Sequence, residues 1–473
     1  MGLTPLGVLR ALPLLGLTLV AGVAIDFSPE ISWHDQQRIE QLILLLVTAL
    51  TVASVCRKNL LISLASLPIS CRWALSIAFL LGGVSTGFSA HPRFAWMEWA
   101  TLLLLVGLVF LLGDQSRRSN ARFDEWSIRL VVALALVIAL KIMTAYLASM
   151  VVMGRLDSIM LFEGTFSNRR FFGQVASMLV PLLAYPLLRG GLSGRAQVAL
   201  FALLAVWWML VIVSGTRGTW AALLLASGVL VLWAWRVVWP WLKLQFAAFS
   251  LGALLFLVLF VWLPWFVGQD ASIEGRLSNL SALNGRAELW TLAWAQIQAH
   301  PWLGIGPMHL AAVRNDFGAH PHNSVLQLAA EWGVPATLAF VLPAAAGMLR
   351  LLGRLRQNEA APNVLLVCLA ASLLAAGAQS MVDGVIVIPY TQTLLALVAG
   401  WALGVYLRDT PLTTVVPDSH MMRIAIPVLS ILAFAALLYG VFPEVLNRAE
   451  VTQAYVDAGK LIPPRYWGVG WIP

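Results

Sequence analysis

The chain has 473 residues, of which 60% are hydrophobic and 11% are charged, and its formal net charge is +8. A soluble domain carries roughly 25% charged residues, so this composition excludes a water-soluble globule and indicates a membrane protein. The basic residues are scattered between apolar segments, which argues against nucleic-acid binding and for control of orientation in the membrane. The three cysteines form neither a metal-binding spacing nor a disulfide framework.

Apolar segments recur along the whole chain, and a spanning helix needs about 20 mostly apolar residues. The first segment resembles a signal peptide because Arg10 precedes it, but no small-residue cleavage site follows, so we expect a retained helix. The thirteen candidate spans are near 5–25, 40–56, 72–90, 94–113, 127–153, 171–188, 196–214, 219–236, 245–266, 322–349, 363–382, 386–407 and 424–443. The predicted fold is an all-α polytopic membrane protein with 12–13 transmembrane helices and one long loop.

Basic residues in the short loops predict the topology, because Lys and Arg are enriched on the cytoplasmic side. The loops after the even-numbered spans hold fifteen Lys and Arg. The short loops on the other side hold six, namely Arg38, Arg93, Arg155, Arg169, Arg170 and Arg217. The even-numbered loops are therefore predicted to be cytoplasmic, and the one long loop, 267–321, to lie outside.

The long loop contains the sequence GRAELWTLAWAQIQAHPWLGIGP, which begins with glycine and a charge and ends in glycine and proline. Trp290, Trp294 and Ile297 recur at i, i+4 and i+7, a spacing that predicts an amphipathic helix. Tryptophans on such a helix suit the bilayer interface, and we favour that placement over a helix packed on its own domain.

Polar groups at membrane depth are costly, so those gathered on the outer side are candidates for function. His322 opens the tenth span within His-Pro-His-Asn, and Gly333 follows eleven residues later, which on a continuous helix is nearly the same face three turns deeper. A histidine at the mouth of the bundle can take a proton from a sugar hydroxyl. The alternative is an interfacial histidine that caps a helix.

Two arginines on the same side suit phosphate recognition, because a guanidinium stays charged and bonds in a fork. Arg286 lies in the long loop, where a solvated loop charge is the favoured explanation from the sequence alone. Arg217 lies in the short turn Ser-Gly-Thr-Arg-Gly-Thr, whose glycines free backbone N–H groups for a small anion nest. A tight hairpin with a snorkelling arginine explains this turn equally well.

Two further ionisable residues stand near helix ends or in mid-span. Asp383 lies in a very short outer connection, where it could orient His322 or pair with an arginine, although a helix-end cap is the favoured explanation. Lys141 lies within a span, where it pairs with a carboxylate such as Glu331 or only packs. No nucleotide-binding motif occurs.

The run GRAELW…AHPWLGIGP…AHPHNSVLQLAAEWGVPA resembles the core region of the bacterial O-antigen ligase and O-antigen polymerase superfamily, which includes the pilin oligosaccharyltransferases. The family pattern is His, then Asn, Ser or Gln, then nine residues and Gly, which His322, Asn323 and Gly333 satisfy. Thr216-Arg217-Gly218 is similar to the family's Ser-Arg-Gly, and Arg286 with Trp290 matches its Arg-x-x-x-Trp. Ala336 departs from the Gly, Thr or Tyr that often follows. The likeness covers 285–340, and more weakly 214–226 and 379–405.

The resemblance implies a type-C glycosyltransferase of the bacterial inner membrane, with its site facing the periplasm and with no metal, nucleotide or other cofactor. The donor would be a glycan linked to undecaprenyl diphosphate, and the reaction would invert the sugar carbon. His322 would be the general base, Arg217 and Arg286 would bind the diphosphate, and Asn323, Asp383 and Gly333 would support them. Typical ligases have twelve spans, one fewer than the thirteen candidates in this chain.

The expected organisation has four parts. Residues 1–266 form an N-terminal transmembrane bundle of about nine spans, and 267–321 a periplasmic helical loop. Residues 322–443 form the C-terminal transmembrane helices, and 444–473 a tail expected in the periplasm.

The acceptor stays open at this stage. O-antigen ligation to lipid A–core ranks first, and O-antigen polymerisation and pilin or protein O-glycosylation are the alternatives within the superfamily. A transporter of lipids or small molecules is the alternative from another class, but transporters carry mid-membrane ion sites and inverted repeats. In this chain the polar groups gather at one face instead, which favours surface chemistry over transport or a non-catalytic scaffold.

Overall fold

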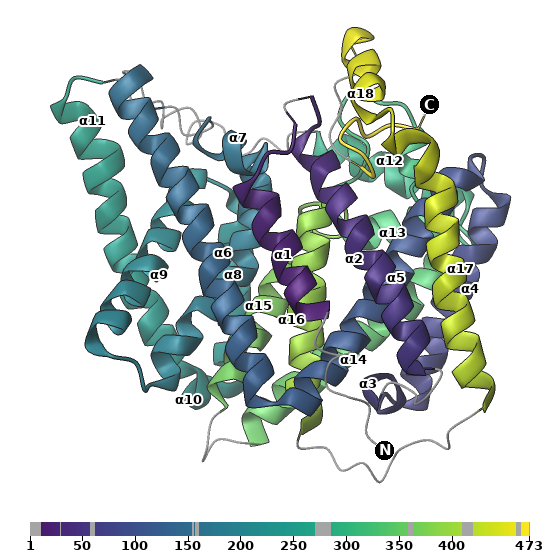
Figure 1. Cartoon of the computed structure of the whole chain (residues 1–473), viewed down its shortest axis with the longest axis horizontal. Coiled ribbons are helices and arrows are strands. Elements are labelled where there is room, and N and C mark those ends of the chain that lie inside the picture. Colours follow the sequence, from purple (N-terminus) through teal and green to yellow (C-terminus); the bar gives the residue numbers. More distant parts are fainter. Residues whose placement is uncertain are drawn as a thin grey trace.

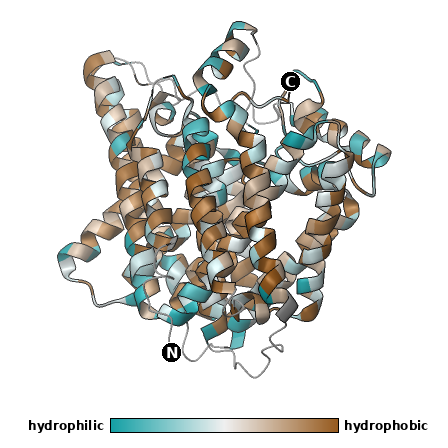
Figure 2. Ribbon diagram, turned by 45° about the vertical axis from the view of Figure 1, so that its right-hand side comes forward, coloured by the Kyte–Doolittle hydropathy of each residue, from teal (hydrophilic) through white to brown (hydrophobic). Residues whose placement is uncertain are grey.

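A computed structural model describes residues 11–28, 30–56, 62–153, 156, 160–269, 285–357, 363–408, 420–459 and 465–472 (Figure 1). The regular elements in this part of the chain are all helices. Apolar residues form a belt through the middle of the bundle, and hydrophilic residues gather towards its two ends (Figure 2). This distribution is the one that a bilayer selects, since only apolar side chains face the hydrocarbon.

The helices divide between the two halves of the chain. The first half contains α1 (Ala11–Ala24), α2 (Trp33–Cys56), α3 (Ile62–Ala65), α4 (Ile69–Phe88), α5 (Pro92–Ser119), α6 (Ala121–Ala148), α7 (Met160–Phe166), α8 (Arg169–Arg189) and α9 (Gly194–Ser214). The second half contains α10 (Arg217–Phe256), α11 (Leu263–Phe266), α12 (Arg286–Ala299), α13 (Ser324–Trp332), α14 (Val334–Gln357), α15 (Val364–Gln379), α16 (Pro389–Arg408), α17 (His420–Val445) and α18 (Arg448–Asp457). Short π-helical segments, Ser149–Met153 and Leu257–Trp262, extend α6 and α10, and His309–Ala312 is a 3-10 turn.

Ten described helices are long and apolar enough to cross a membrane, which confirms the predicted polytopic all-α fold. The count differs from thirteen for two reasons. The predicted first and eleventh spans correspond to the shorter apolar helices α1 and α15, and the predicted eighth and ninth spans belong to the single 50-residue stretch Arg217–Phe266. That stretch bends at Ala234, whose φ of −149° and ψ of 50° are not helical.

The predicted tenth span is divided at Gly333, so the expectation of one continuous helix from His322 was wrong. Gly333 has a φ of +84° and separates α13 from α14. A Cβ at this position would lie 2.2 Å from the carbonyl oxygen of Trp302, so only glycine lets the 302–303 backbone pass. The glycine therefore permits the close approach of the 302–303 loop to the break between the two helices.

The centre of the bundle is formed by α8 and α16, the most buried of the long helices. Gly400 and Gly404 of α16 let it approach α5, because a Cβ at either would meet α5 atoms within 2.7 Å. Arg408, at the end of α16, forms an ion pair of 2.7 Å with Asp124 of α6. These contacts fix the helix that begins beside the candidate site.

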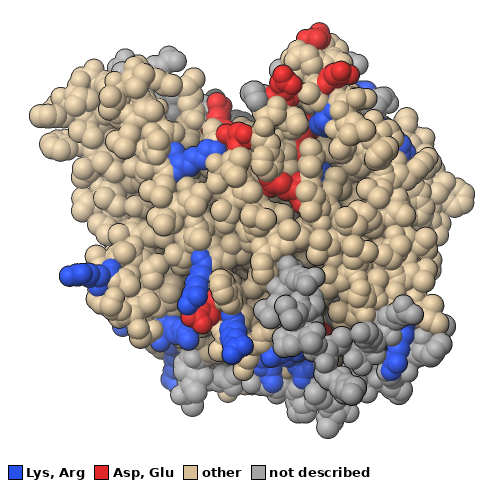
Figure 3. Space-filling view, viewed as in Figure 1, with Lys and Arg blue, Asp and Glu red and all other residues tan. Residues whose placement is uncertain are grey.

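The two ends of the bundle differ in charge and in structure. In Figure 1, α7, α11, α12 and α18 lie at the upper end, and α3 lies at the lower end. On the face drawn in Figure 3, most Lys and Arg lie near the lower edge and most Asp and Glu near the upper edge. The residues predicted to carry chemistry belong to the upper end.

Substitution of Gly333 by alanine should destabilise the protein by about 2 kcal/mol or more, because the new Cβ adds left-handed strain and a clash with Trp302. Thermal unfolding of the purified protein in detergent would measure this as a lower Tm. Gly353→Ala is the matched control, since nothing lies within 4 Å of a Cβ there. Equal Tm values for the two variants would contradict this account of the helix break.

Candidate functional site

The starts of four helices, α8, α10, α12 and α13, converge at the upper end of the bundle. Gly173 of α8 has no side chain, and a Cβ there would lie 2.3 Å from the hydroxyl of Thr219 in α10. Trp290 of α12 donates its indole N–H to the carbonyl of Pro321 at 2.8 Å, just before α13. The N–H of Ser324 donates to the carbonyl of Ser380 at 2.8 Å. These contacts place the four helix starts around one region.

His322 faces Asp383, and this pair is the centre of the site. The imidazole Nδ1 lies 3.6 Å from a carboxylate oxygen of Asp383, and both side chains are largely buried. The backbone of His322 has a φ of +51°, an uncommon conformation for a residue other than glycine. His322 and Asp383 therefore lie close together, as predicted. A backbone conformation of this kind persists only where the surrounding structure holds it.

Asp383 is held in its charged form. Burial alone would raise the pKa of this carboxyl, but its contact with His322, the N–H of Gly384 and the charge of Arg170 outweigh burial and lower it. One carboxylate oxygen accepts the N–H of Gly384 at 2.9 Å, and the other accepts the amide of Gln379 at 3.3 Å. Asp383 is thus a negative group aimed at the imidazole rather than only a helix cap.

Arginines gather beside this pair. Burial lowers the pKa of Arg286, the positive charges of Arg170 and Arg217 lower it further, and the charge of Asp383 opposes them. The two arginines predicted from the sequence therefore lie within electrostatic reach of one another and of Asp383. A half-buried cation beside other cations is a candidate site for an anionic ligand.

Arg170 is a residue that the sequence analysis missed. It follows the first residue of α8, and the side chain of Asn168 accepts its backbone N–H at 2.8 Å. Its charge acts on Arg286, Asp383 and His320. The sequence showed it as one of two arginines in a short outer loop, and only the packing of Gly173 against α10 brings it to the site.

His320 was also missed, and it lies directly behind His322. The two rings are 4.1 Å apart between centroids, and the backbone N–H of His322 donates to Nδ1 of His320 at 3.3 Å. Burial lowers the pKa of His320 well below its ordinary value, and the charges of His322 and Arg465 lower it further. His320 is therefore a neutral imidazole that accepts the N–H of the strained residue.

Asn323 and the turn before Arg217 form local structure at two of the helix starts. Asn323 caps α13, because its side chain accepts the N–H groups of Val325 and Leu326 at 3.0 Å. In the turn before Arg217, the N–H of Gly215 donates to the carbonyl of Ile212, so this group does not form the expected anion nest. Arg217 instead begins α10, where the positive end of the helix dipole adds to its own charge.

The predicted helix is present as α12, but its inward face is shifted by one residue and packs against α13 and the 3-10 turn. It is a helix packed on its own domain, the alternative that the sequence analysis did not favour. Leu289, Ala293 and Ile297 are buried, whereas Trp294 is 55% exposed. Arg286 begins this helix, one turn before Trp290, so the indole bond to Pro321 also orients the start of the helix towards His322.

Lys141 and Glu331 do not pair with each other. Lys141 lies 3.5 Å from Asp26, and Glu331 instead binds Arg465. The suggested pairing of Lys141 with Glu331 is therefore wrong, since each residue forms an ion pair with a different partner. Among the described residues, no group of three His, Cys, Asp or Glu is arranged to hold a metal ion.

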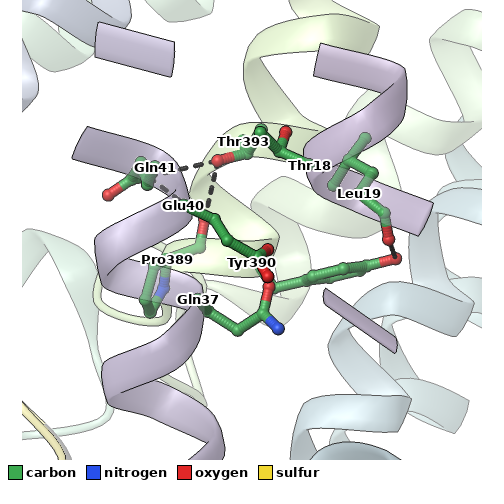
Figure 4. A pocket seen from close by; sticks show the side chains of 8 residues that line it. All are labelled: Thr18, Leu19, Gln37, Glu40, Gln41, Pro389, Tyr390 and Thr393. Atoms are coloured by element: carbon green, nitrogen blue, oxygen red, sulfur yellow. Dashed lines mark hydrogen bonds between the residues drawn. The ribbon is translucent and has the colours of Figure 1, made fainter. Parts of the chain in front are cut away.

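A second polar region lies between α1, α2 and α16. Figure 4 shows a small pocket there, whose polar lining comes from Thr18, Gln37, Glu40, Gln41 and Thr393. Glu40 is buried, and one of its carboxylate oxygens has no hydrogen-bond partner. This pocket carries no arginine in its lining, so it differs in charge from the region around His322.

Replacement of Arg286 by glutamine should leave the Tm of the unliganded protein unchanged or raise it, because it removes repulsion from Arg170 and Arg217. Inorganic pyrophosphate, as a test anion, should raise the Tm of the wild type and raise that of the variant much less. Thermal unfolding of both proteins with increasing pyrophosphate measures this. An equal rise in both proteins would show that the anion binds elsewhere.

Comparison with known sequences agrees with this geometry. No curated protein sequence matches the chain. Residues 199–341 match a protein family described as O-antigen ligase. The matched range includes Arg217, Arg286, His322 and Gly333, and so holds three of the four helix starts that converge on the site. The chain therefore contains a domain of the O-antigen ligase family, within a multi-pass membrane protein.

Proposed function

We propose that this protein transfers a glycan from undecaprenyl diphosphate to an acceptor hydroxyl at the periplasmic face of the bacterial inner membrane. The O-antigen ligase family domain supports glycan transfer of the ligase or polymerase type. The observation that carries the proposal is the His322–Asp383 pair within reach of Arg170, Arg217 and Arg286. A general base beside a cluster of cations is what attack on a diphosphate-linked sugar requires.

His322 is the proposed general base. In the proposed mechanism the neutral ring carries its proton on Nδ1, on the side of Asp383, and Nε2 is the atom that accepts a proton. The acceptor hydroxyl gives its proton to Nε2 as its oxygen forms a bond to the anomeric carbon. The carboxylate of Asp383 stabilises the imidazolium that forms, as the buried aspartate does in serine hydrolases.

The leaving group is undecaprenyl diphosphate, which takes the electron pair of the broken bond between the anomeric carbon and oxygen. Arg217 and Arg286 bind the diphosphate and stabilise the additional charge as it develops. Attack from the side opposite to the leaving group inverts the sugar carbon. Preorganised cations contribute most when they are partly desolvated, and burial of Arg286 supports this role. In the proposed mechanism the arginines act without a metal ion or a nucleotide.

The proposed orientation places the site outside the cytoplasm. The loops predicted to be cytoplasmic hold fifteen Lys and Arg against six in the short outer loops. The helix α12 and the starts of α8, α10 and α13 belong to the opposite end of the bundle from α3 (Figure 1). Residues 267–321 are then the periplasmic loop between two groups of spanning helices, 1–266 and 322–443, and 444–473 is a periplasmic tail.

The preferred acceptor is lipid A–core, which makes the protein an O-antigen ligase. The alternatives are a second lipid-linked glycan, for a polymerase, and a protein hydroxyl, such as a pilin serine. A lipid or small-molecule transporter is the alternative from another class. The cluster at one end of the bundle favours transfer over transport, because transport sites lie near mid-membrane.

Substitution of His322 by alanine should lower the rate of glycan transfer by about 10² or more, because the acceptor hydroxyl loses its general base. A reconstituted assay with purified protein, lipid-linked glycan and acceptor measures this rate. His300→Ala is the matched control, since His300 is an exposed histidine at the end of α12. Near-normal transfer by the His322 variant would remove this residue as the base.

A strain that lacks the protein should identify the acceptor. Loss of polymer from lipid A–core, with pilin mass unchanged, is expected for a ligase. Lipid A–core that carries single repeats indicates a polymerase, and a lighter pilin indicates protein glycosylation. Gel analysis of lipopolysaccharide and mass spectrometry of pilin provide both measurements, and no change in either would contradict glycan transfer to any of these acceptors.

A further inference from the structure

Residues 465–472 fold back against the candidate site, although they are distant from it in sequence. Arg465 is only 2% exposed and forms ion pairs with Glu98 of α5, at 2.7 Å, and with Glu331 of α13. The other carboxylate oxygen of Glu331 accepts the N–H of Leu310 at 3.0 Å. Arg465 thus fixes the last turn of α13, the helix whose start follows His322.

Tyr466, the next residue, is connected to the segment that carries Asp383. The carbonyl of Tyr466 accepts hydrogen bonds from His34 and Arg38 of α2, at 3.0 and 3.1 Å. Arg38 also donates to the carbonyl of Val387 at 3.0 Å. Val387 lies four residues after Asp383 in the short turn before α16, so Tyr466 is connected through Arg38 to the turn that holds the carboxylate.

We infer that Arg465 and Tyr466 position His322 relative to Asp383, and we call these two residues the joint. Arg465 is a positioning residue that acts through α13 and through His320. The inference rests on the proposed function of His322. Two adjacent residues hold two helices whose ends carry the two members of the pair. Loosening the joint changes the geometry of the pair without removing any group that touches substrate.

The charge of Arg465 also affects the protonation of His320. The charged and titratable groups that face His320 are His322 beside it, Arg465 of the folded-back segment, His34 of α2 and Arg170 of α8. Positive charge and burial both lower the pKa of His320, so its Nδ1 stays free to accept the N–H of His322. Removal of the charge of Arg465 lets His320 take up a proton at a higher pH, which ends that hydrogen bond.

The pH dependence of transfer by the full-length protein tests this. Arg465→Gln should move the acid limb of kcat/KM upwards by on the order of half to one pH unit. Arg465→Lys keeps the charge and should not move it. Arg448→Gln is the matched control, because Arg448 is equally buried but pairs with Asp35 and stacks on Trp467. No shift in Arg465→Gln, or an equal shift in Arg465→Lys, would overturn the inference.

Glu331 allows the Arg465 variant to fold. Burial raises the pKa of Glu331 and the charge of Arg465 lowers it, so this carboxyl can take up a proton when its partner is lost. The double variant Glu331→Gln/Arg465→Gln removes the buried acid as well. It should show the same upward shift of the acid limb, relative to Glu331→Gln alone.

A second measurement does not need transfer activity. Because the folded-state pKa of His320 is below the unfolded value of about 6.5, folding keeps this ring neutral, and stability falls as the pH drops below that unfolded value. The fall in Tm from about pH 7.5 to the lowest pH at which both variants stay folded should be smaller for Glu331→Gln/Arg465→Gln than for Glu331→Gln, because the fall ends when the pH passes the folded-state pKa of His320. An equal fall in Tm in the two variants would refute the effect of Arg465 on His320. A smaller fall in a protein that transfers no glycan would refute the proposed function and leave the joint standing.

Discussion

An excess of positive charge around one carboxylate is the constraint on which the site depends. Arg170, Arg217 and Arg286 each stand in the first two residues of a helix, where the helix dipole is also positive. Such a cluster is unfavourable until an anion binds, so the packing of α8 and α16 at the centre of the bundle must offset it. In the proposed function this positive charge binds a polyanion, and the diphosphate of a lipid-linked glycan has that chemistry.

The proposed catalytic pair, His322 and Asp383, is supported by neutral and paired groups. His320 accepts the backbone N–H of His322, and Arg465 is neutralised by two glutamates rather than left free. A buried charge persists only when it is paired or bonded, so this layer of the structure tolerates little change. The result is a separation of roles, in which the arginines at the helix starts are proposed to bind the diphosphate and the ion pairs of Arg465 lie in the supporting layer.

Composition and spacing predicted the membrane fold and a helix in the long loop, because apolar length and periodicity are properties of adjacent residues. The roles of His322, Arg217 and Arg286 came from the family resemblance, since spacing alone favoured a solvated charge for Arg286 and left the other two open. The break at Gly333 was not predicted, since it depends on the backbone of Trp302 passing beside it. Arg170 and Arg465 were missed for the same reason. Their positions follow from helix contacts between segments far apart in sequence, and nothing in their own neighbourhood distinguishes them from ordinary loop charges.

The left-handed backbone of His322 restricts how this position can change during evolution. Asparagine and aspartate adopt positive φ more readily than other side chains, whereas β-branched residues do so with difficulty. An aspartate here would face Asp383 and repel it, and an asparagine would not act as a base at neutral pH. For a general base at this position, the proposed role, the main-chain conformation and the neighbouring carboxylate together favour histidine. Descendants with a different base here would first need a different turn.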